Sequence, residues 1–189
     1  MPSIRQDWVS ILTPHDRENK IVVMALFAVL GVPPSYFDVG SGTGAMVNLA
    51  RKIGVDAWGA DQIARPQEYL IQHNLEFPLD LDRGFHLVTC LETAEHLPES
   101  AADVLCDTIV RHTKPGGVIV FTAAPPGQAG DGHVNCQPAQ YWHAKFWDRG
   151  CEWKSEKQSL VQLAWTIANH SQKWLPANVL VFQRLGGQE

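Results

Sequence analysis

The stretch that decides the fold is Tyr36-Phe37-Asp38-Val39-Gly40-Ser41-Gly42-Thr43-Gly44, in which a short strand runs directly into three glycines at alternate positions. Glycine lets a ligand come close to the main chain, because no Cβ blocks the approach. A helix is predicted to begin at Ala45, so its amino terminus would face the loop and favour an anionic group. The spacing is G-x-G-x-G and differs from the G-x-G-x-x-G of dinucleotide-binding proteins. The loop therefore predicts a small-ligand site between a strand and a helix.

An acidic residue follows at a distance that strengthens this prediction. Asp61 ends the next predicted strand, 21 residues after Gly40. An acid at the end of that strand can accept hydrogen bonds from both hydroxyls of a ribose. Since strand, glycine loop, helix, second strand and acid occur in this order, a glycine-rich turn that binds nothing is the weaker interpretation.

Strands and helices alternate along the rest of the chain. Helices are predicted, from apolar residues at helical spacing and from glycine or proline stops, over residues 16–30, 45–53, 101–112, 138–147 and 160–168. Strands are predicted, from short apolar runs, over residues 36–39, 55–60, 69–73, 85–90, 118–122 and 179–182. Residues 62–68 leave room for at most one turn of helix, and Lys114-Pro115-Gly116-Gly117 is predicted to end the helix before residue 118. This alternation predicts an α/β fold with a doubly wound, mostly parallel sheet that binds ligands at the carboxyl ends of its strands.

Length and composition indicate a single domain over residues 1–189. The chain is 45% hydrophobic and 19% charged, so it can bury a core of its own. We expect an amino-terminal helical segment over residues 1–34, a cofactor-binding core over 35–125, and an acceptor-side loop, helices and closing strand over 126–189. With 15 basic and 20 acidic residues the net charge is −5, so neither nucleic acid nor an anionic membrane is expected as a partner.

Other features favour a cytoplasmic location. Residues 21–32 form the longest apolar run, which is shorter than the span of about 20 residues that a bilayer requires. Residues 4–11 lack the basic-then-apolar pattern of a secretion leader. The cysteines show neither paired nor metal-ligand spacing, so free thiols are expected at Cys90, Cys106, Cys136 and Cys151. The sequence leaves the oligomeric state open.

These motifs together resemble the nucleoside-binding core of class I S-adenosylmethionine-dependent methyltransferases, over roughly residues 35 to 125. The resemblance rests on Phe37 to Gly44, Gly59-Ala60-Asp61, Phe85-His86-Leu87-Val88, Glu95-His96-Leu97 and Lys114-Pro115-Gly116-Gly117. It implies a seven-stranded Rossmann-like sheet, with Asp61 on the ribose diol and Gly40 and Gly42 near the methionine part. The cofactor contacts that it implies are Gly40, Ser41, Gly42, Gly44, Asp61, Gln62, Asn74 and Leu91.

The sequence departs from this family in the region of the adenine. The third strand usually ends in an acid that accepts a hydrogen bond from the adenine amino group. Here Asn74 offers a side-chain carbonyl for the same hydrogen bond, and Asp80 is the alternative. The helix between the second and third strands is absent, which would leave the adenine pocket more open. Asp38 is expected to orient the loop backbone.

A second group of polar residues follows the fourth predicted strand. Glu92, Glu95 and His96 stand at i, i+3 and i+4, so one helical turn would place all three on one face. His133 lies in a flexible loop after the fifth strand. In one interpretation these four residues bind Mg, Mn or Zn, which would lower the pKa of an acceptor hydroxyl. The E-x-x-E-H turn with a later histidine resembles that of the small-RNA 2′-O-methyltransferases and the ubiquinone-pathway O-methyltransferases.

Two other interpretations need no metal. In the first, His133 or His96 is the catalytic general base, because the unperturbed pKa of an imidazole, about 6.5, suits that task. In the second, Glu95 ties loops together and His96 lines the cleft. The other six histidines are expected to be structural, and Tyr141 with Trp142 can supply an aromatic wall for the acceptor.

The sequence thus predicts methyl transfer from S-adenosylmethionine to an oxygen of a small acceptor, such as a sugar or phenol hydroxyl. Two alternatives come from other classes. One is a nucleoside-binding partner or regulatory subunit that has lost catalysis. The other is a nicotinamide-dependent oxidoreductase, which the G-x-G-x-G spacing makes the weaker interpretation.

Overall fold

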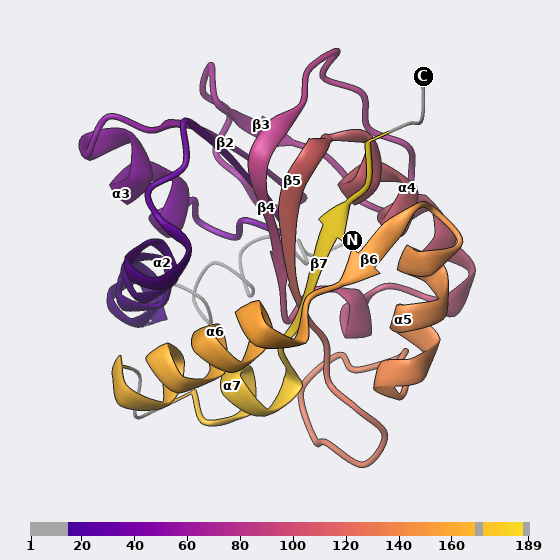
Figure 1. Cartoon of the computed structure of the whole chain (residues 1–189). Coiled ribbons are helices and arrows are strands. Elements are labelled where there is room, and N and C mark those ends of the chain that lie inside the picture. Colours follow the sequence, from indigo (N-terminus) through magenta and orange to yellow (C-terminus); the bar gives the residue numbers. More distant parts are fainter. Residues whose placement is uncertain (1–14, 169–171, 187–189) are drawn as a thin grey trace.

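The computed structural model describes residues 15–168 and 172–186 (Figure 1). The expectations for residues 1–14, including the absence of a leader and the first part of the helical segment, lie outside the described residues, as does His170. None of the described helices is both long enough and apolar enough to span a membrane.

A seven-stranded sheet forms the centre of the molecule, with the strand order β3-β2-β1-β4-β5-β7-β6. The first five strands pair in parallel, whereas β7 is antiparallel to both β5 and β6. The strands are β1 (Ser35–Val39), β2 (Asp56–Asp61), β3 (Leu70–Gln72), β4 (Phe85–Leu91), β5 (Thr113–Thr122), β6 (Cys151–Trp153) and β7 (Leu180–Arg184). The prediction of a doubly wound, mostly parallel sheet of seven strands is confirmed.

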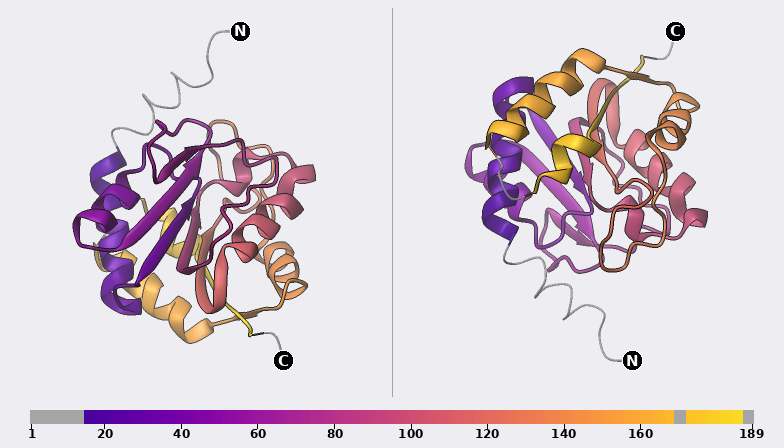
Figure 2. Two further views of the ribbon diagram at one scale, coloured as in Figure 1. Left: turned by 90° about the horizontal axis from the view of Figure 1, so that it is seen from above. Right: turned by 90° about the horizontal axis from the view of Figure 1, so that it is seen from below.

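Helices cover both faces of the sheet (Figure 2). One layer holds α2 (Asp16–Leu30), α3 (Ala45–Lys52) and α6 (Ser155–Ala168), and α2 packs against both of the others. The opposite layer holds α4 (Ala102–Arg111) and α5 (Ala139–Trp147), while the short α7 (Trp174–Asn178) packs on α6. Each face of the sheet thus has its own helical cover, as a doubly wound fold requires.

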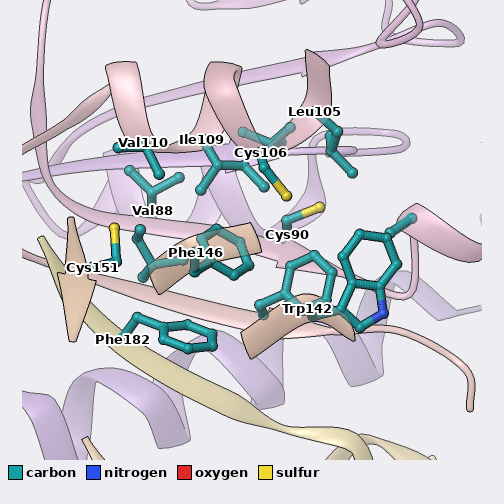
Figure 3. Packing of buried hydrophobic residues seen from close by; sticks show 14 of the residues in the cluster. Val88, Cys90, Leu105, Cys106, Ile109, Val110, Trp142, Phe146, Cys151 and Phe182 are labelled. Carbon is teal, nitrogen blue, oxygen red and sulfur yellow. The ribbon is translucent and has the colours of Figure 1, made fainter. Parts of the chain in front are cut away.

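Buried side chains form one hydrophobic cluster on each face of the sheet. We call the cluster on the face covered by α2 the α2 cluster, and the one on the face covered by α4 the α4 cluster. Tyr36 belongs to the α2 cluster and its neighbour Phe37 to the α4 cluster, because successive side chains of a strand point to opposite faces. All five residues of β1 are buried, as expected for a central parallel strand covered on both sides. Figure 3 shows the α4 cluster, in which Val88, Ile109 and Phe146 pack between sheet and helices.

The structure corrects the prediction at four places, one of which is the start of α6, at Ser155 and not at residue 160. Lys114-Pro115-Gly116-Gly117 lies inside β5 rather than before it, because Thr113 already pairs with Phe85 and the next pair is Val118 with Leu87. The four residues bulge out between these pairs, and Gly116 has the positive φ of 77° that such a bulge permits. β6 and α7 were not predicted, since three and five residues are too few to show a periodic pattern.

Candidate active site

The glycine loop follows β1 at the carboxyl edge of the sheet, as predicted. Gly40, Gly42 and Gly44 have φ values of 82°, 55° and 81°, in the left-handed region that favours glycine. The Ala60 carbonyl accepts hydrogen bonds from the backbone N–H groups of Gly40 at 2.8 Å and Ser41 at 3.1 Å. The loop is therefore fastened to the end of β2, beside Asp61.

Two of the three loop glycines, Gly40 and Gly44, are needed for packing within the protein, which the sequence did not indicate. A Cβ on Gly40 would collide with the side chain of Thr93, and one on Gly44 would lie 2.7 Å from a Leu70 methyl group. The expectation was that a Cβ would block a ligand, whereas at these two positions it would strike the protein itself. Thr93 thus brings the turn after β4 into direct contact with the glycine loop.

Asp61 connects the glycine loop to the segment that follows β2. Its Oδ2 accepts a hydrogen bond from Gly42 N–H at 2.8 Å, and its Oδ1 accepts one from Ile63 N–H at 2.9 Å. Burial raises the pKa of Asp61, and the backbone donors at Ile63 and Gly42 act against that rise. Each carboxylate oxygen has a second lone pair, so hydrogen bonds from two ribose hydroxyls remain possible.

Two buried oxygen atoms near the loop have no hydrogen-bond partner, Ser41 Oγ and Asp38 Oδ2. The other oxygen of Asp38 accepts a 2.6 Å hydrogen bond from Thr89 Oγ1, a side chain of β4 and not the loop backbone that Asp38 was expected to orient. Burial raises the pKa of Asp38 to about 7. Buried polar atoms normally have partners. These two acceptors therefore fit a ligand that brings an amino group and hydroxyls, as S-adenosylmethionine would.

The two residues considered for the adenine, Asn74 and Asp80, lie at opposite edges of the sheet. Asn74 lies just beyond β3 at the carboxyl edge, where its Oδ1 accepts a hydrogen bond from Glu76 N–H at 3.0 Å. Asp80 instead accepts a 2.7 Å hydrogen bond from Arg111, the last residue of α4, next to the start of β5. That position is at the amino edge of the sheet, so Asp80 does not suit the adenine.

Gln62 and Leu91 also lie where the sequence placed them. Gln62 follows β2, and its carbonyl accepts a hydrogen bond from Gln72 Nε2 at 3.1 Å. Leu91 is the last residue of β4 and is half-buried. Residues 62–69 contain no helix, as predicted, and only turns and an isolated bridge from Gln67 to Leu70 connect β2 with β3.

The structure brings together three of the four residues proposed as metal ligands. Ligand atoms of Glu95, His96 and His133 all lie within 4.8 Å of one another. The centres of the two imidazole rings are 5.0 Å apart. Glu92 is not in this group, because the turn is a 3-10 helix, η2 (Ala94–His96), which begins after Glu92. The helical turn expected over Glu92, Glu95 and His96 is therefore not formed, although the Glu92 side chain still lies beside that of Glu95.

Glu92 instead joins two residues that the sequence analysis did not identify. It has a positive φ of 46°. Its Oε2 accepts a hydrogen bond from Gln128 Nε2 and its Oε1 one from Asn178 Nδ2, both at 3.3 Å. Asn178 Nδ2 also donates to Gln128 Oε1 at 3.0 Å. The hydrogen bonds among Glu92, Gln128 and Asn178 thus connect the loop after β5 and the end of α7 to the end of β4. No sequence signal could have revealed them, since the three residues are 36 to 86 residues apart.

Hydrogen bonds define the tautomers of both histidines. His133 Nδ1 lies 3.2 Å from the Gln128 carbonyl, and His96 Nδ1 lies 3.2 Å from the Gly132 carbonyl. A carbonyl only accepts, so in each neutral ring Nδ1 carries the proton and Nε2 the lone pair. Burial lowers the pKa of His96, the hydrogen bond to the Gly132 carbonyl acts against that change, and the charge of His133 adds to it. A Cβ on Gly130 would collide with the His133 ring, so this glycine makes room for the imidazole.

Glu95 is fully buried next to the two histidines. Its Oε1 accepts a hydrogen bond from Ala124 N–H at 3.2 Å, and its carbonyl accepts from Val134 N–H at 2.8 Å and Asn135 N–H at 3.1 Å. Glu95 therefore ties the loop after β5 to η2, as one interpretation expected. Burial, and then the charge of Glu92, raise the pKa of Glu95 to about 8. Its Oε2 has no hydrogen-bond partner in the structure.

This buried acid should make stability depend on pH. Because the folded-state pKa of Glu95 is about 8 and its ordinary value 4.5, the folded protein holds a proton that the unfolded chain releases. The free energy of unfolding should therefore fall as the pH rises from about 4.5 to 8, by up to about 5 kcal/mol from this group. Glu95→Gln keeps an acceptor for Ala124 N–H and should flatten this slope. Urea unfolding between pH 5 and 8.5 in EDTA measures it.

The exposed Glu99→Gln is the matched control and should keep the wild-type slope. Asp38, whose pKa is also raised, contributes a slope of the same sign, so Glu95→Gln should retain part of the effect. A Glu95→Gln protein with the full wild-type slope would show that Glu95 is not the group responsible.

Comparison with known proteins shows which family the chain belongs to. A methyltransferase domain family matches residues 15–165 of the chain. The ubiquinone biosynthesis O-methyltransferase of Colwellia psychrerythraea is 31% identical over 100 residues, which cover 45% of this chain and 39% of that protein. The corresponding enzyme of Methylococcus capsulatus is 33% identical over 99 residues, covering 45% and 41%. The match thus spans about two fifths of the length of these curated relatives.

Solved structures with the same fold are more distant in sequence. The sugar N-methyltransferase KedS8 from Streptoalloteichus has a TM-score of 0.65 at 17% identity, over 89% of this chain and 87% of that one. The amino pentose methyltransferase CalS10 from Micromonospora echinaspora, solved with S-adenosylmethionine bound, has a TM-score of 0.62 at 18% identity, over 89% and 90%. These likenesses show the fold, while the family match covers most of the chain. The chain therefore belongs to the methyltransferase domain family.

Proposed function

We propose that this chain transfers a methyl group from S-adenosylmethionine to a hydroxyl oxygen of a small acceptor, such as a sugar or a phenol. The observation that carries this proposal is the contact between the two halves of the site. The Thr93 side chain fills the space that a Cβ of Gly40 would occupy, so the turn bearing His96 abuts the glycine loop. A cofactor on the loop and an acceptor at the histidines would then be neighbours.

The chain's contribution to the reaction is mainly alignment of two reactants, together with removal of one proton. S-adenosylmethionine supplies, when bound, an electrophilic methyl group on a sulfonium sulfur. Asp61 and the glycine loop would hold it, with Gln62 and Asn74 on the adenine side. The acceptor hydroxyl would lie at His133, whose Nε2 would take the hydroxyl proton as the oxygen accepts the methyl group. The Gln128 carbonyl keeps the His133 ring in the required tautomer.

A divalent cation at Glu95, His96 and His133 is the second form of the proposal. The Glu95 Oε2 atom without a partner and the two Nε2 lone pairs would provide the ligands. Two imidazoles and one carboxylate suit Zn²⁺ or Mn²⁺ better than Mg²⁺, which prefers oxygen ligands. In this form the Nε2 lone pairs of the two histidines would hold the cation and would not be available to take the acceptor proton.

A methyl-transfer screen over sugar, phenol, nucleoside and amine acceptors tests the proposal, run with EDTA and with added Mn²⁺, Zn²⁺ or Mg²⁺. We expect methyl ethers from at least one hydroxyl acceptor. Activity that survives EDTA supports the histidine base, and activity lost to EDTA and restored by Mn²⁺ or Zn²⁺ supports the metal. Transfer to amines alone, or no transfer by protein that binds the cofactor, would contradict the proposal.

A further inference from the structure

A cavity of about 260 Å³ lies beyond the carboxyl ends of β5 and β6, at the start of β7. Side chains from α5, α6 and α7 close it on the other sides. It is lined by Phe121, Ala123, Pro125, Gln137, Ala139, Trp142, His143, Gln158, Ala177, Asn178, Val179 and Leu180. None of these residues belongs to the nucleoside site described above, and only Asn178 takes part in the hydrogen bonds around Glu92.

The indole of Trp142 provides an independent sign of a ligand. Trp142 lines the cavity and is only 2% exposed, yet its Nε1 has no hydrogen-bond partner. Its ring packs on Phe121, with the centres 4.9 Å apart. Figure 3 shows the indole nitrogen on the side of the ring that faces away from Phe146 and Phe182. A buried donor without an acceptor is costly, about 1–3 kcal/mol, and a bound acceptor atom would remove that cost.

The lining defines the chemistry of the occupant. It contains no Asp, Glu, Lys or Arg among the described residues, so nothing there would balance a charged group. Burial lowers the pKa of His143, which favours its uncharged form. A cavity of about 150 Å³ is large enough for benzene. The larger volume here suits one ring with a few substituents.

The cavity also adjoins the proposed reaction site. Asn178 lines it and donates to Glu92, and Gln137 lines it and donates to Asn135 at 2.9 Å. Asn135 N–H in turn donates to the carbonyl of Glu95, next to the histidines. The cavity is thus connected to the histidine site through Asn178 and Gln137.

We propose that this cavity binds a single uncharged ring bearing an oxygen atom, which accepts a hydrogen bond from Trp142 Nε1. The ring is the part of the methyl acceptor that lies beyond its reacting hydroxyl. The assignment to the acceptor rests on the proposed function, whereas the binding of the ring does not. The acceptor is accordingly a neutral, ring-bearing molecule and not a phosphorylated or carboxylated one.

Nuclear magnetic resonance of the indole N–H groups tests this inference with phenol as the probe. The Trp142 resonance is assigned as the one missing from Trp142→Phe. We expect phenol to shift it saturably, while benzoate, which is charged, and toluene, which has no oxygen, shift it much less. Trp142→Phe should weaken phenol binding roughly five- to tenfold, the effect of one hydrogen bond.

Ala177→Phe places a ring at the mouth of the cavity from an exposed position and should weaken phenol binding at least tenfold. Ala28→Phe, on the exposed side of α2, is the matched control and should leave it unchanged. A Trp142 resonance that phenol does not move, or that benzoate moves equally, would overturn the inference. Binding of S-adenosylhomocysteine is measured on the same sample, and its absence together with a normal phenol shift would count against the proposed function alone.

Discussion

His133→Ala should lower kcat for methyl transfer by roughly 100- to 10,000-fold, the range that removal of a general base gives. The reason is the geometry at His133: its Nδ1–H donates to the Gln128 carbonyl, which leaves Nε2 as the atom that takes the acceptor proton. The dissociation constant for S-adenosylhomocysteine should stay within about twofold, since the ring is not among the residues expected to hold the cofactor. Initial rates and calorimetric titrations measure the two quantities.

Two control experiments distinguish a catalytic role of His133 from a structural one. His86→Ala removes an exposed histidine of β4 that hydrogen-bonds to Ser35, at the opposite edge of the sheet, and should leave kcat unchanged. Added imidazole should partly restore the His133→Ala protein, which a purely structural loss would not allow. A His133→Ala protein with kcat close to that of the wild type would exclude His133 as base and as metal ligand.

Asp61→Ala should weaken the binding of S-adenosylhomocysteine by roughly 100-fold or more, because hydrogen bonds to charged groups contribute about 1.5–3 kcal/mol each. The substitution removes the acceptors proposed for the ribose hydroxyls. It also frees the N–H groups of Gly42 and Ile63, which Asp61 now holds. Isothermal titration calorimetry measures the change.

Asp56→Ala is the matched control, since Asp56 starts the same strand and forms an exposed ion pair with Arg83. Exposed pairs contribute little to stability, so this variant should bind like the wild type. Asp61→Asn keeps one oxygen acceptor and should give an intermediate affinity. If Asp61→Ala bound the ligand as tightly as the wild type, the ribose would have to lie elsewhere.

Long, regular elements of the fold were predictable from the sequence. The helix over residues 16–30 has the predicted bounds, because apolar residues recur at helical spacing up to Gly31. The strand β5 was predicted only in part, since a proline and two glycines normally mark a turn and here form a bulge paired across β4. The short β6 is held in place by its pairing with β7, a contact more than 25 residues away in the chain.

The candidate site was predictable where its residues are close in sequence or belong to a known motif. Asp61 and the glycine loop lie together as predicted, and His96 and His133 lie side by side. Glu92 was misplaced because its positive φ, which no pattern indicates, turns it out of the helical register. The contacts of Asn178 and the lack of a hydrogen-bond partner at Trp142 Nε1 can be recognised only in the folded structure.

The most direct test of the central claim is a calorimetric titration of the wild-type protein with S-adenosylhomocysteine and, separately, with NADH. The G-x-G-x-G loop fastened to Ala60 and Asp61 predicts saturable binding of S-adenosylhomocysteine at one site per chain and no measurable heat with NADH. Saturable binding of NADH, with none of S-adenosylhomocysteine, would contradict this account.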